Sequence, residues 1–315
     1  MKIKEKPILV AIHCLVYNHE PYLRDCLNGF IMQKTNFRFV AVVHDDASTD
    51  RSASIIREYE EKYPNIIKPI YETENQYTKH DGSHRRIMNE AICATGAKYV
   101  AFCEGDDYWT DPLKLQKQVE FLEAHPDFSM CCHGADVKNE TSHHIDSACE
   151  HMTTREYFPE DAFPTWQIPT ASIMYRYKDV MSYPLKREKD FEAGDVVLIL
   201  RCMHVGRVWG MAEHMSVYRM NPGGITSKKS TMSSQLKMCT HYEALMANFP
   251  KIDTDYCHRF IAMVHYTNFR QAKDWKAKLK SLTEAIKNKP SYVIRKVLHL
   301  KSNPRKDLFY QYYGQ

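Results

Sequence analysis

Residues 99–109, YVAFCEGDDYW, are the stretch on which the interpretation of this chain depends. The first five are apolar, which predicts a buried strand, and Glu104, Asp106 and Asp107 follow directly, with Gly105 between the first two. Carboxylates at the end of an interior strand are costly unless a metal or another cation meets them. Hard oxygen ligands favour Mn2+ or Mg2+, which usually bridge carboxylates to substrate phosphates. We therefore expect a divalent cation at these acids.

A simpler explanation is that the acids cap the next helix. Thr110, Asp111 and Pro112 follow at once, and an aspartate before a proline at the first helical position already makes a helix start. Three more acids exceed what a cap needs, so the cation site is the explanation that we favour.

Apolar runs alternate with amphipathic segments through the first third of the chain. This alternation predicts an α/β fold with a parallel, helix-flanked sheet. Ligands of such sheets bind in the crevice at the carboxyl ends of the strands. The predicted strands are 8–13, 39–44, 66–71 and 99–103, and the predicted helices are one beginning at Pro21, one beginning after Ser48 or Asp50 and ending at Pro64, 83–95 and 112–124.

The second half of the chain has a weaker pattern. Strands are predicted at 128–133, 172–176 and 215–219, and a short helix at 195–202. Residues 138–164 are polar and show little periodicity, so we expect a loop or a small excursion there. From 233 to about 300 the pattern is helical, with breaks at Pro250 and Pro290.

Composition limits the class of protein. The chain has 315 residues, 43% hydrophobic and 26% charged, enough for one large domain or a domain with an appendage. No stretch resembles a secretory signal or is long enough to cross a bilayer. The ten cysteines are scattered without CxxC spacing, as expected for reduced thiols in a cytoplasmic protein.

The positive charge lies mainly at the carboxyl end. Residues 271–315 hold eleven lysines or arginines against three acids, whereas the whole chain is only +4. A basic, partly apolar helical segment is typical of a peripheral membrane contact, and a solvated helical face explains it equally well. Nucleic acid is not an expected partner, because the predicted crevice is acidic and the basic end carries no reading motif.

Four groups of residues carry the predicted chemistry: 17–20 (YNHE), 45–50 (DDASTD), 104–107 (EGDD) and 194–195 (GD). Each alone has a local explanation, as a turn or a helix cap. Together, three of them follow strands of one parallel sheet, whose carboxyl ends share one edge. One set can accept hydrogen bonds from a nucleobase and a ribose, and another can hold a metal on a diphosphate. Because no phosphate-binding GxxxxGK[ST] or GxGxxG loop is present, metal and basic side chains such as Arg85 or Arg86 must neutralise that diphosphate.

Three segments in this order and spacing resemble a family-2 glycosyltransferase of the glycosyltransferase A fold. They are LVYNHEPYLRDCLNGFIMQ from residue 15, VVHDDASTD from residue 42 and FCEGDDYWTDPLKLQKQ from residue 102. The resemblance is clear over about 7–136 and thinner to about 227. The fold that it implies is a Rossmann-like, mostly parallel sheet flanked by helices.

The resemblance also implies roles for individual residues. The Tyr17 loop and Asp46 or Asp45 would hold the base and ribose, and Glu104-Gly105-Asp106 stands where the family has its Asp-x-Asp metal motif. A glutamate replaces the first aspartate of that motif. The expected metal ligands are Asp106, Glu104 and Asp107, and the expected donor contacts are Leu15, Tyr17, Asn18, Glu20, Asp45, Asp46, Arg86, Gly105 and Asp106.

The catalytic base of the family is the aspartate of a Glu-Asp pair before a helix. Here the pair reads Gly194-Asp195, so the resemblance implies that Asp195 is the base although its preceding glutamate is missing. Such enzymes invert the anomeric centre in one displacement. Residues 218–227, with Gly223 and Gly224, resemble the family's closing segment, and the resemblance implies a loop that folds over the donor.

The implied protein is a metal-dependent transferase that builds a bacterial surface polysaccharide or glycolipid from a nucleotide sugar, with a UDP-sugar favoured. Its acceptor would be a glycan or a lipid-linked glycan. Residues 1–230 would form the catalytic domain, with the donor half at about 1–136 and the acceptor half at about 137–230, and 231–315 a helical basic extension. Trp166 and His204 are candidate acceptor-side residues. The location would be cytoplasmic, with peripheral contact at the inner face of the membrane.

Two other functions stay open. A sugar-phosphate nucleotidyltransferase also uses a parallel sheet, but it would carry a glycine-rich loop where this chain has Leu15 to Asn18. A non-catalytic nucleotide-sugar or glycan-binding protein would keep the fold and lose the base, as the missing glutamate before Asp195 allows.

Overall fold

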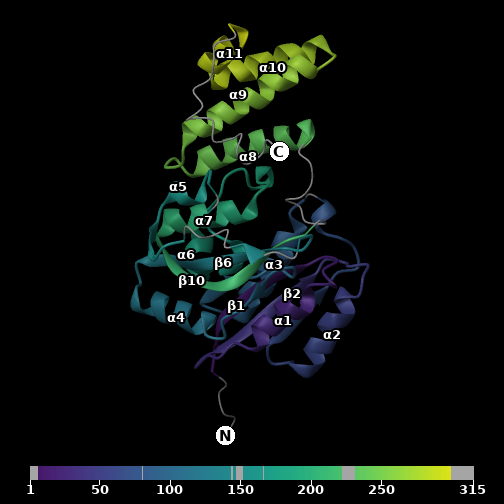
Figure 1. The fold of residues 1–315 in the computed structure, drawn as a ribbon, viewed down its shortest axis with the longest axis vertical. Helices are drawn as coiled ribbons and strands as arrows, with labels where there is room; N and C mark the ends of the chain where they lie inside the picture. Colours follow the sequence, from purple (N-terminus) through teal and green to yellow (C-terminus); the bar gives the residue numbers. More distant parts are fainter. Residues whose placement is uncertain are drawn as a thin grey trace. The chain divides into compact units, whose positions relative to one another are not determined.

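The computed structural model describes residues 6–79, 81–142, 145–146, 152–165, 167–221 and 231–298. The chain forms two compact units: residues 1–185 with 193–228, and residues 186–192 with 229–315. The first unit contains a β-sheet flanked by helices, and the second contains the helices α8 to α11 (Figure 1).

The sheet of the first unit is mixed. Its strand order is β3-β2-β1-β4-β9-β6-β10-β5, with β7 beside β6 and β8 beside β10. Neighbouring strands from β3 to β4 are parallel, as are β6 and β10, whereas β9 runs antiparallel to both β4 and β6. The predicted α/β fold class is confirmed. The strands are β1 Ile8–Val16, β2 Arg38–Asp45, β3 Ile67–Tyr71, β4 Tyr99–Phe102, β5 Tyr108–Trp109, β6 Phe128–Asn139, β7 Ile145–Asp146, β8 Arg155–Tyr157, β9 Met174–Arg176 and β10 Arg207–Met220.

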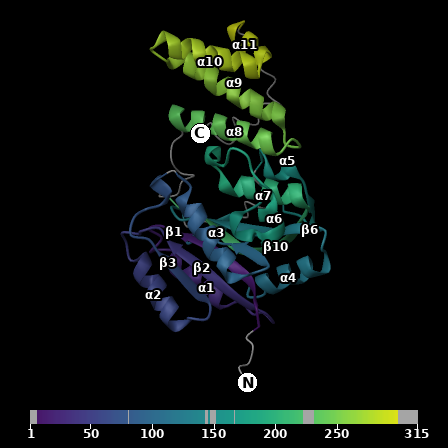
Figure 2. The ribbon, with the colours of Figure 1, turned by 180° about the vertical axis from the view of Figure 1, so that it is seen from behind.

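Helices cover both faces of the parallel part (Figures 1 and 2). α1 and α2 pack on the face that carries Ile12 and Val43, whereas Ala91 and Ala94 of α3 lie by Val42 on the other. No helix of the described ranges is long and apolar enough to cross a membrane. The helices are α1 Leu23–Ile31, α2 Ser52–Lys62, α3 Ser83–Thr95, α4 Lys114–Ala124, α5 Pro159–Ala162, α6 Tyr177–Ser182, α7 Gly194–Val205, α8 Met232–Asn248, α9 Thr254–Gln271, α10 Trp275–Asn288 and α11 Pro290–Val297.

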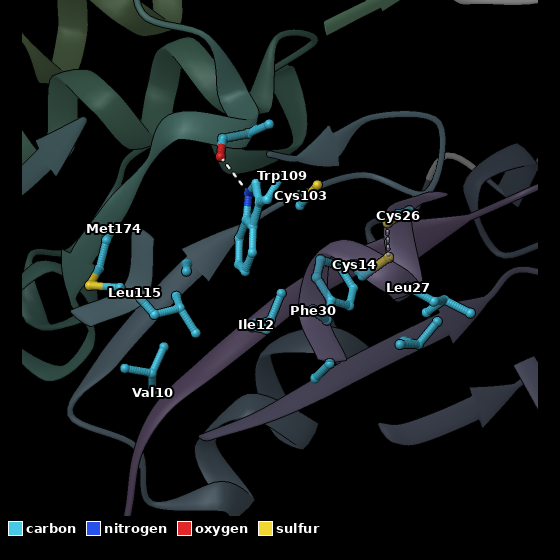
Figure 3. Packing of buried hydrophobic residues seen from close by; sticks show 14 of the residues in the cluster. Val10, Ile12, Cys14, Cys26, Leu27, Phe30, Cys103, Trp109, Leu115 and Met174 are labelled. Atoms are coloured by element: carbon cyan, nitrogen blue, oxygen red, sulfur yellow. Dashed lines mark hydrogen bonds between the residues drawn. The ribbon is translucent and has the colours of Figure 1, made fainter. Parts of the chain in front are cut away.

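The core fixes the segment that carries the acids. Trp109 is 2% exposed and meets Phe30 edge-on at 5.1 Å between ring centroids (Figure 3). Its indole Nε1 donates to the Ala171 carbonyl at 2.9 Å, a bond that reaches across 62 residues. The indole of Trp109 has both an apolar contact and a hydrogen bond. Trp109 therefore fixes the C-terminal end of the acidic loop that precedes it.

The structure differs from the predicted elements mainly after residue 136. Strand β10 begins at Arg207, eight residues before the predicted start, and the 138–164 stretch contains β8 and α5. Exposed and buried residues mix irregularly along β10, with Glu213 exposed, because its register to β6 shifts three times. The helical region also has a break between α9 and α10, which the sequence pattern did not predict.

Lys114, in the first turn of α4, is fully buried. Its Nζ lies 3.8 Å from the centroid of the Trp109 ring and has no hydrogen-bond partner among the described residues. Burial lowers the pKa of Lys114 to about 7. The unfolded chain holds this proton up to its ordinary pKa near 10.5, so folding carries a cost that is complete below pH 7 and disappears as the pH rises toward 10.5.

We expect Lys114→Met to raise the free energy of unfolding by about 1–3 kcal/mol at pH 6 and by less at pH 9. Urea unfolding at both pH values measures it. The matched control is Lys117→Met on the same helix, where the lysine is partly exposed and paired with Asp111 and Glu213. A loss of stability in Lys114→Met would show instead that the ammonium is well accommodated over Trp109.

Candidate active site

The acidic loop 104–107 connects β4 to β5 and is attached to the end of β1. The Gly105 N–H donates to the Leu15 carbonyl at 2.9 Å. A Cβ on Gly105 would lie 2.7 Å from His19 Nδ1 and 2.9 Å from Val16 Cγ2. Only glycine therefore lets the loop approach β1 this closely.

Gly105→Ala is expected to lower the free energy of unfolding by about 1–3 kcal/mol, because Val16 and the backbone of Leu15 cannot move aside. Urea denaturation is the measurement. Gly194→Ala is the control, since a Cβ there meets nothing within 4 Å. If the two variants are equally stable, the loop is looser than its contacts indicate.

Three carboxylates come together at this loop and α7. Packing of protein around Glu104, and then the negative charges of Asp106 and Asp195, raise the pKa of Glu104 to about 8. Glu104 keeps access to solvent, and Asp195 lies in the first turn of α7, partly buried. The negative charge of Asp195 thus acts on Glu104, although the two residues are far apart in the sequence. A cation between them would relieve that repulsion.

The side chain of Asp106 is held from two sides. Asn221 Nδ2 donates to Asp106 Oδ2 at 2.9 Å, and His19 Nε2 lies 3.9 Å from the same oxygen. Burial lowers the pKa of His19, and its Nδ1 is buried without a hydrogen-bond partner in the described part of the chain. Asp106 Oδ2 therefore has a defined position beside the loop.

Asp107 is buried and hydrogen-bonded to β10. It is 2% exposed, and its Oδ1 accepts the backbone N–H of Arg219 at 2.9 Å. Burial, followed by the nearby charge of Asp106, raises the pKa of Asp107 well above its ordinary value. Asp107 joins the loop to β10 and does not share the open position of Glu104.

Arg219 connects β10 to the loop. Its side chain is 2% exposed, and Nη1 donates to the Asp106 carbonyl at 2.8 Å. Nε donates to Glu140 at 2.8 Å, Nη2 pairs with Asp25, and the guanidinium lies 4.3 Å from the centroid of the Tyr108 ring. The buried guanidinium of Arg219 thus joins the acidic loop to β10.

Arg219→Met is expected to lower the free energy of unfolding by about 2–4 kcal/mol, because it removes the buried donor of the Asp106 carbonyl and leaves the half-buried Glu140 with its pair to Lys138 only partly compensated. Chemical denaturation measures this. Arg24→Met removes an arginine from an exposed pair with Glu58, and it should leave the free energy of unfolding nearly unchanged. Equal losses would mean that Arg219 has no special structural role.

The loop after β1 is fixed by the loop after β2. Ser48 Oγ accepts the Asn18 N–H at 2.9 Å, and Asn18 Oδ1 accepts the Thr49 N–H at 2.8 Å. The Glu20 carboxylate accepts the Arg51 N–H at 3.0 Å. Asn18 and Glu20 thus use side-chain oxygens to join the two loops. Tyr17 is 46% exposed, which leaves its ring available to a ligand.

The two aspartates at the end of β2 have different surroundings. Both oxygens of Asp46 accept backbone N–H groups, from Gln76 at 2.6 Å and from Tyr77 at 3.0 Å. Asp45 is 2% exposed, burial raises its pKa, and its Oδ1 has no partner within the described ranges. Asp46 is therefore occupied by the backbone of residues 76–77, whereas Asp45 has an unused acceptor. Arg86 is exposed on α3, the helix that follows these residues.

The chemical type of the acids suits a hard divalent cation. Glu104 is exposed and Asp106 is partly exposed, and the charges of Asp106 and Asp195 act on Glu104. The described residues contain no group of three His, Cys, Asp or Glu side chains placed to hold a metal ion. Mg2+ and Mn2+ commonly take only one or two carboxylates and complete their shell with phosphate oxygens and water, a number that Glu104 and Asp106 can supply.

Sequence analysis did not predict contacts of three residues with the acids. Some residues that it did predict lie outside the described ranges. His19 lies in the 17–20 group, and Arg219 and Asn221 lie in the segment 218–227, but no spacing rule pairs residue 219 with residue 107 or residue 221 with residue 106. The predicted closing glycines Gly223 and Gly224, and Trp166, lie outside the described residues. His204 is exposed, with its ring 4.2 Å from that of Tyr183.

Comparison with known proteins places the chain in a family. The family model described as glycosyl transferase family 2 matches residues 12–180, more than half of the chain. The chain belongs to this family. A Mycobacterium bovis protein described as uncharacterized is 36% identical over 222 residues, 69% of this chain and 60% of that protein. The chain thus spans about 60% of the length of this relative.

Solved structures share the fold. S. aureus TarS 1-349 in complex with UDP-GlcNAc has a TM-score of 0.61 at 15% identity, over 89% of this chain and 81% of that one. The mannosyltransferase PcManGT from Pyrobaculum calidifontis, in complex with GDP-Man and Mn2+, has a TM-score of 0.54 at 16% identity, over 98% and 80%. The glycosyltransferase A fold expected from the motifs is confirmed.

Proposed function

We propose that this chain is an inverting glycosyltransferase that moves a sugar from a nucleotide-diphosphate sugar to a hydroxyl of a glycan or lipid-linked acceptor. The observation that carries the proposal is that the charges of Asp106 and Asp195, from a loop and a helix about 90 residues apart in the sequence, both act on Glu104. Family membership and the nucleotide-sugar complexes of TarS and PcManGT support it.

The donor is held by the loops at the strand ends. The exposed Tyr17 ring would stack on the base. Asp45 would accept a hydrogen bond from the base or the ribose. The backbone around Leu15 and Gly105 would form the bottom of the donor site. Asp46, Asn18 and Glu20 keep these loops in place through the hydrogen bonds described above. Arg86 would offset diphosphate charge. A UDP-sugar remains our favoured donor.

Glu104 and Asp106 are the proposed ligands of Mn2+ or Mg2+, and Asp107 orients their loop. The ion would supply positive charge to the leaving diphosphate. Asp195 would take the proton of the acceptor hydroxyl while its oxygen bonds to the anomeric carbon and the bond from that carbon to the diphosphate breaks. Since attack comes from the face opposite the diphosphate, the anomeric configuration inverts.

The chemistry fits a bacterial enzyme of surface polysaccharide or glycolipid synthesis. We place it in the cytoplasm, where nucleotide sugars are made. A lipid-linked acceptor would require contact with the inner face of the membrane, for which the second unit offers a surface, described in the next subsection.

The test is release of nucleoside diphosphate from a panel of UDP-, GDP- and dTDP-sugars, with Mn2+ and with a chelator, each with and without a crude glycolipid acceptor. We expect one donor to react, only when metal is present. Calorimetric binding of a donor without release under every condition would favour the non-catalytic binding protein. Neither binding nor release from any donor would overturn the proposal.

A further inference from the structure

Helix α10 has an inner face that packs on the protein and an outer apolar face. The described residues do not cover the outer face. The inner face contains the buried Ser281 and Ala285 and packs toward α9, where Asn268 donates to Ser281 Oγ at 2.8 Å. On the other side, apolar side chains recur at i, i+4, i+7 and i+11, the spacing of one helical stripe. This outer stripe consists of Trp275, Leu279, Leu282 and Ile286.

The outer stripe is exposed to an unusual degree. Trp275 is 66% exposed, Leu279 57% and Ile286 45%, whereas tryptophan is normally among the better-buried residue types. A shallow hollow of about 420 Å³ runs along this part of α10, lined by Trp275, Leu279 and neighbouring polar residues. Contiguous apolar exposure of this kind marks an interaction surface.

A row of lysines runs beside the stripe. Lys276, Lys280 and Lys287 are exposed and repeat at i, i+4 and i+11, in phase with the apolar residues, and Lys287 also pairs with Glu284 at 3.6 Å. Over residues 275–298 there are seven lysines or arginines and one acid, Glu284. The surface is therefore both apolar and strongly cationic.

Helix α11 also carries exposed apolar and basic side chains. Ile294, Val297 and Leu298 are 54%, 60% and 61% exposed, and the exposed Arg295 and Lys296 lie among them. Val293, in contrast, is 5% exposed and belongs to the packing of the unit. An apolar and basic surface thus covers both of the last described helices.

We propose that this surface, Trp275, Leu279, Leu282 and Ile286 with Lys276, Lys280 and Lys287, docks on a bilayer of anionic phospholipid. Tryptophan and aliphatic side chains enter the boundary of the acyl region while lysines meet phosphate groups. A second copy of the chain is a poorer partner, because pairing the stripes would bring the lysine rows together. A soluble polyanion would use the lysines and leave the apolar stripe unused.

The test is flotation of the full chain with vesicles of phosphatidylcholine, alone or with equimolar phosphatidylglycerol. We expect at least about tenfold tighter binding to the anionic vesicles, weakened by salt. Trp275→Ser/Leu279→Ser and Lys276→Glu/Lys280→Glu should each weaken that binding about tenfold or more. Leu113→Ser and Lys237→Glu/Lys251→Glu, which change exposed residues elsewhere, are the matched controls.

Two results would overturn the proposal. One is equal vesicle binding by the wild type, both α10 variants and the controls. The other is an absence of vesicle binding together with self-association, seen as a rise in mass with concentration that Trp275→Ser/Leu279→Ser abolishes. Neither donor nor acceptor is needed, so failure here leaves the proposed transferase activity standing, and failure of transfer leaves membrane binding standing.

Discussion

Replacement of Asp106 by alanine is expected to lower kcat/KM for sugar transfer by about 10³-fold. Asp106 is the proposed metal ligand whose Oδ2 position is defined by Asn221 and His19, so alanine removes both the charge and a prearranged ligand. The variant should also lose its dependence on Mn2+ concentration. Initial rates over a metal titration, with the donor found in the panel, measure both effects.

Asp111→Asn is the matched control for Asp106→Ala. Asp111 lies five residues further on, and its carboxylate pairs with Lys117 and accepts the Leu113 N–H instead of facing the crevice. It should keep activity within about threefold, as expected away from the reacting groups. Full metal-dependent activity in Asp106→Ala would remove Asp106 from the metal site.

Asp195→Asn is expected to lower kcat by about 10³-fold while leaving the KM for the donor nearly unchanged. The amide has the shape of the carboxylate but cannot take the proton of the acceptor hydroxyl. Slow hydrolysis of the donor to nucleoside diphosphate should persist, because the proposed donor and metal contacts stay intact. Transfer and hydrolysis are therefore followed separately.

Helix stability has to be distinguished from base catalysis in that variant. An acid in the first turn of a helix interacts favourably with the helix dipole, so loss of Asp195 could act through α7 alone. Asp179→Asn makes the same change in the first turn of α6, at an exposed position. If both variants lose transfer to a similar extent, Asp195 acts on structure and the base lies elsewhere.

The donor half was predicted well because its signals are local. The helix predicted at 83–95 is α3, Ser83–Thr95, and the strand predicted at 99–103 is β4, Tyr99–Phe102. Buried parallel strands are short, continuous apolar runs, and glycine or proline marks the ends of the helices between them. The acids of 104–107 could be placed at a strand end for the same reason.

The other half depends on partners distant in the sequence. β5, β7 and β8 have two or three residues each, too short for any periodic signal. β5 and β8 are placed by pairing with β10, and β10 itself pairs with β6, whose residues lie about 80 positions away along the chain. A local pattern contains no information on such pairing.

The sequence by itself determined the α/β architecture, the family resemblance and the set of carboxylates at the strand ends, since these follow from the order of short segments. Only the tertiary structure decided what each carboxylate does. Asp46 and Asp107 are occupied by backbone N–H groups of Gln76, Tyr77 and Arg219, whereas Glu104 and Asp195 approach each other. The physical reason is that the donors which occupy Asp46 and Asp107 come from residues 30 to 112 positions away, so only folding brings them to these carboxylates.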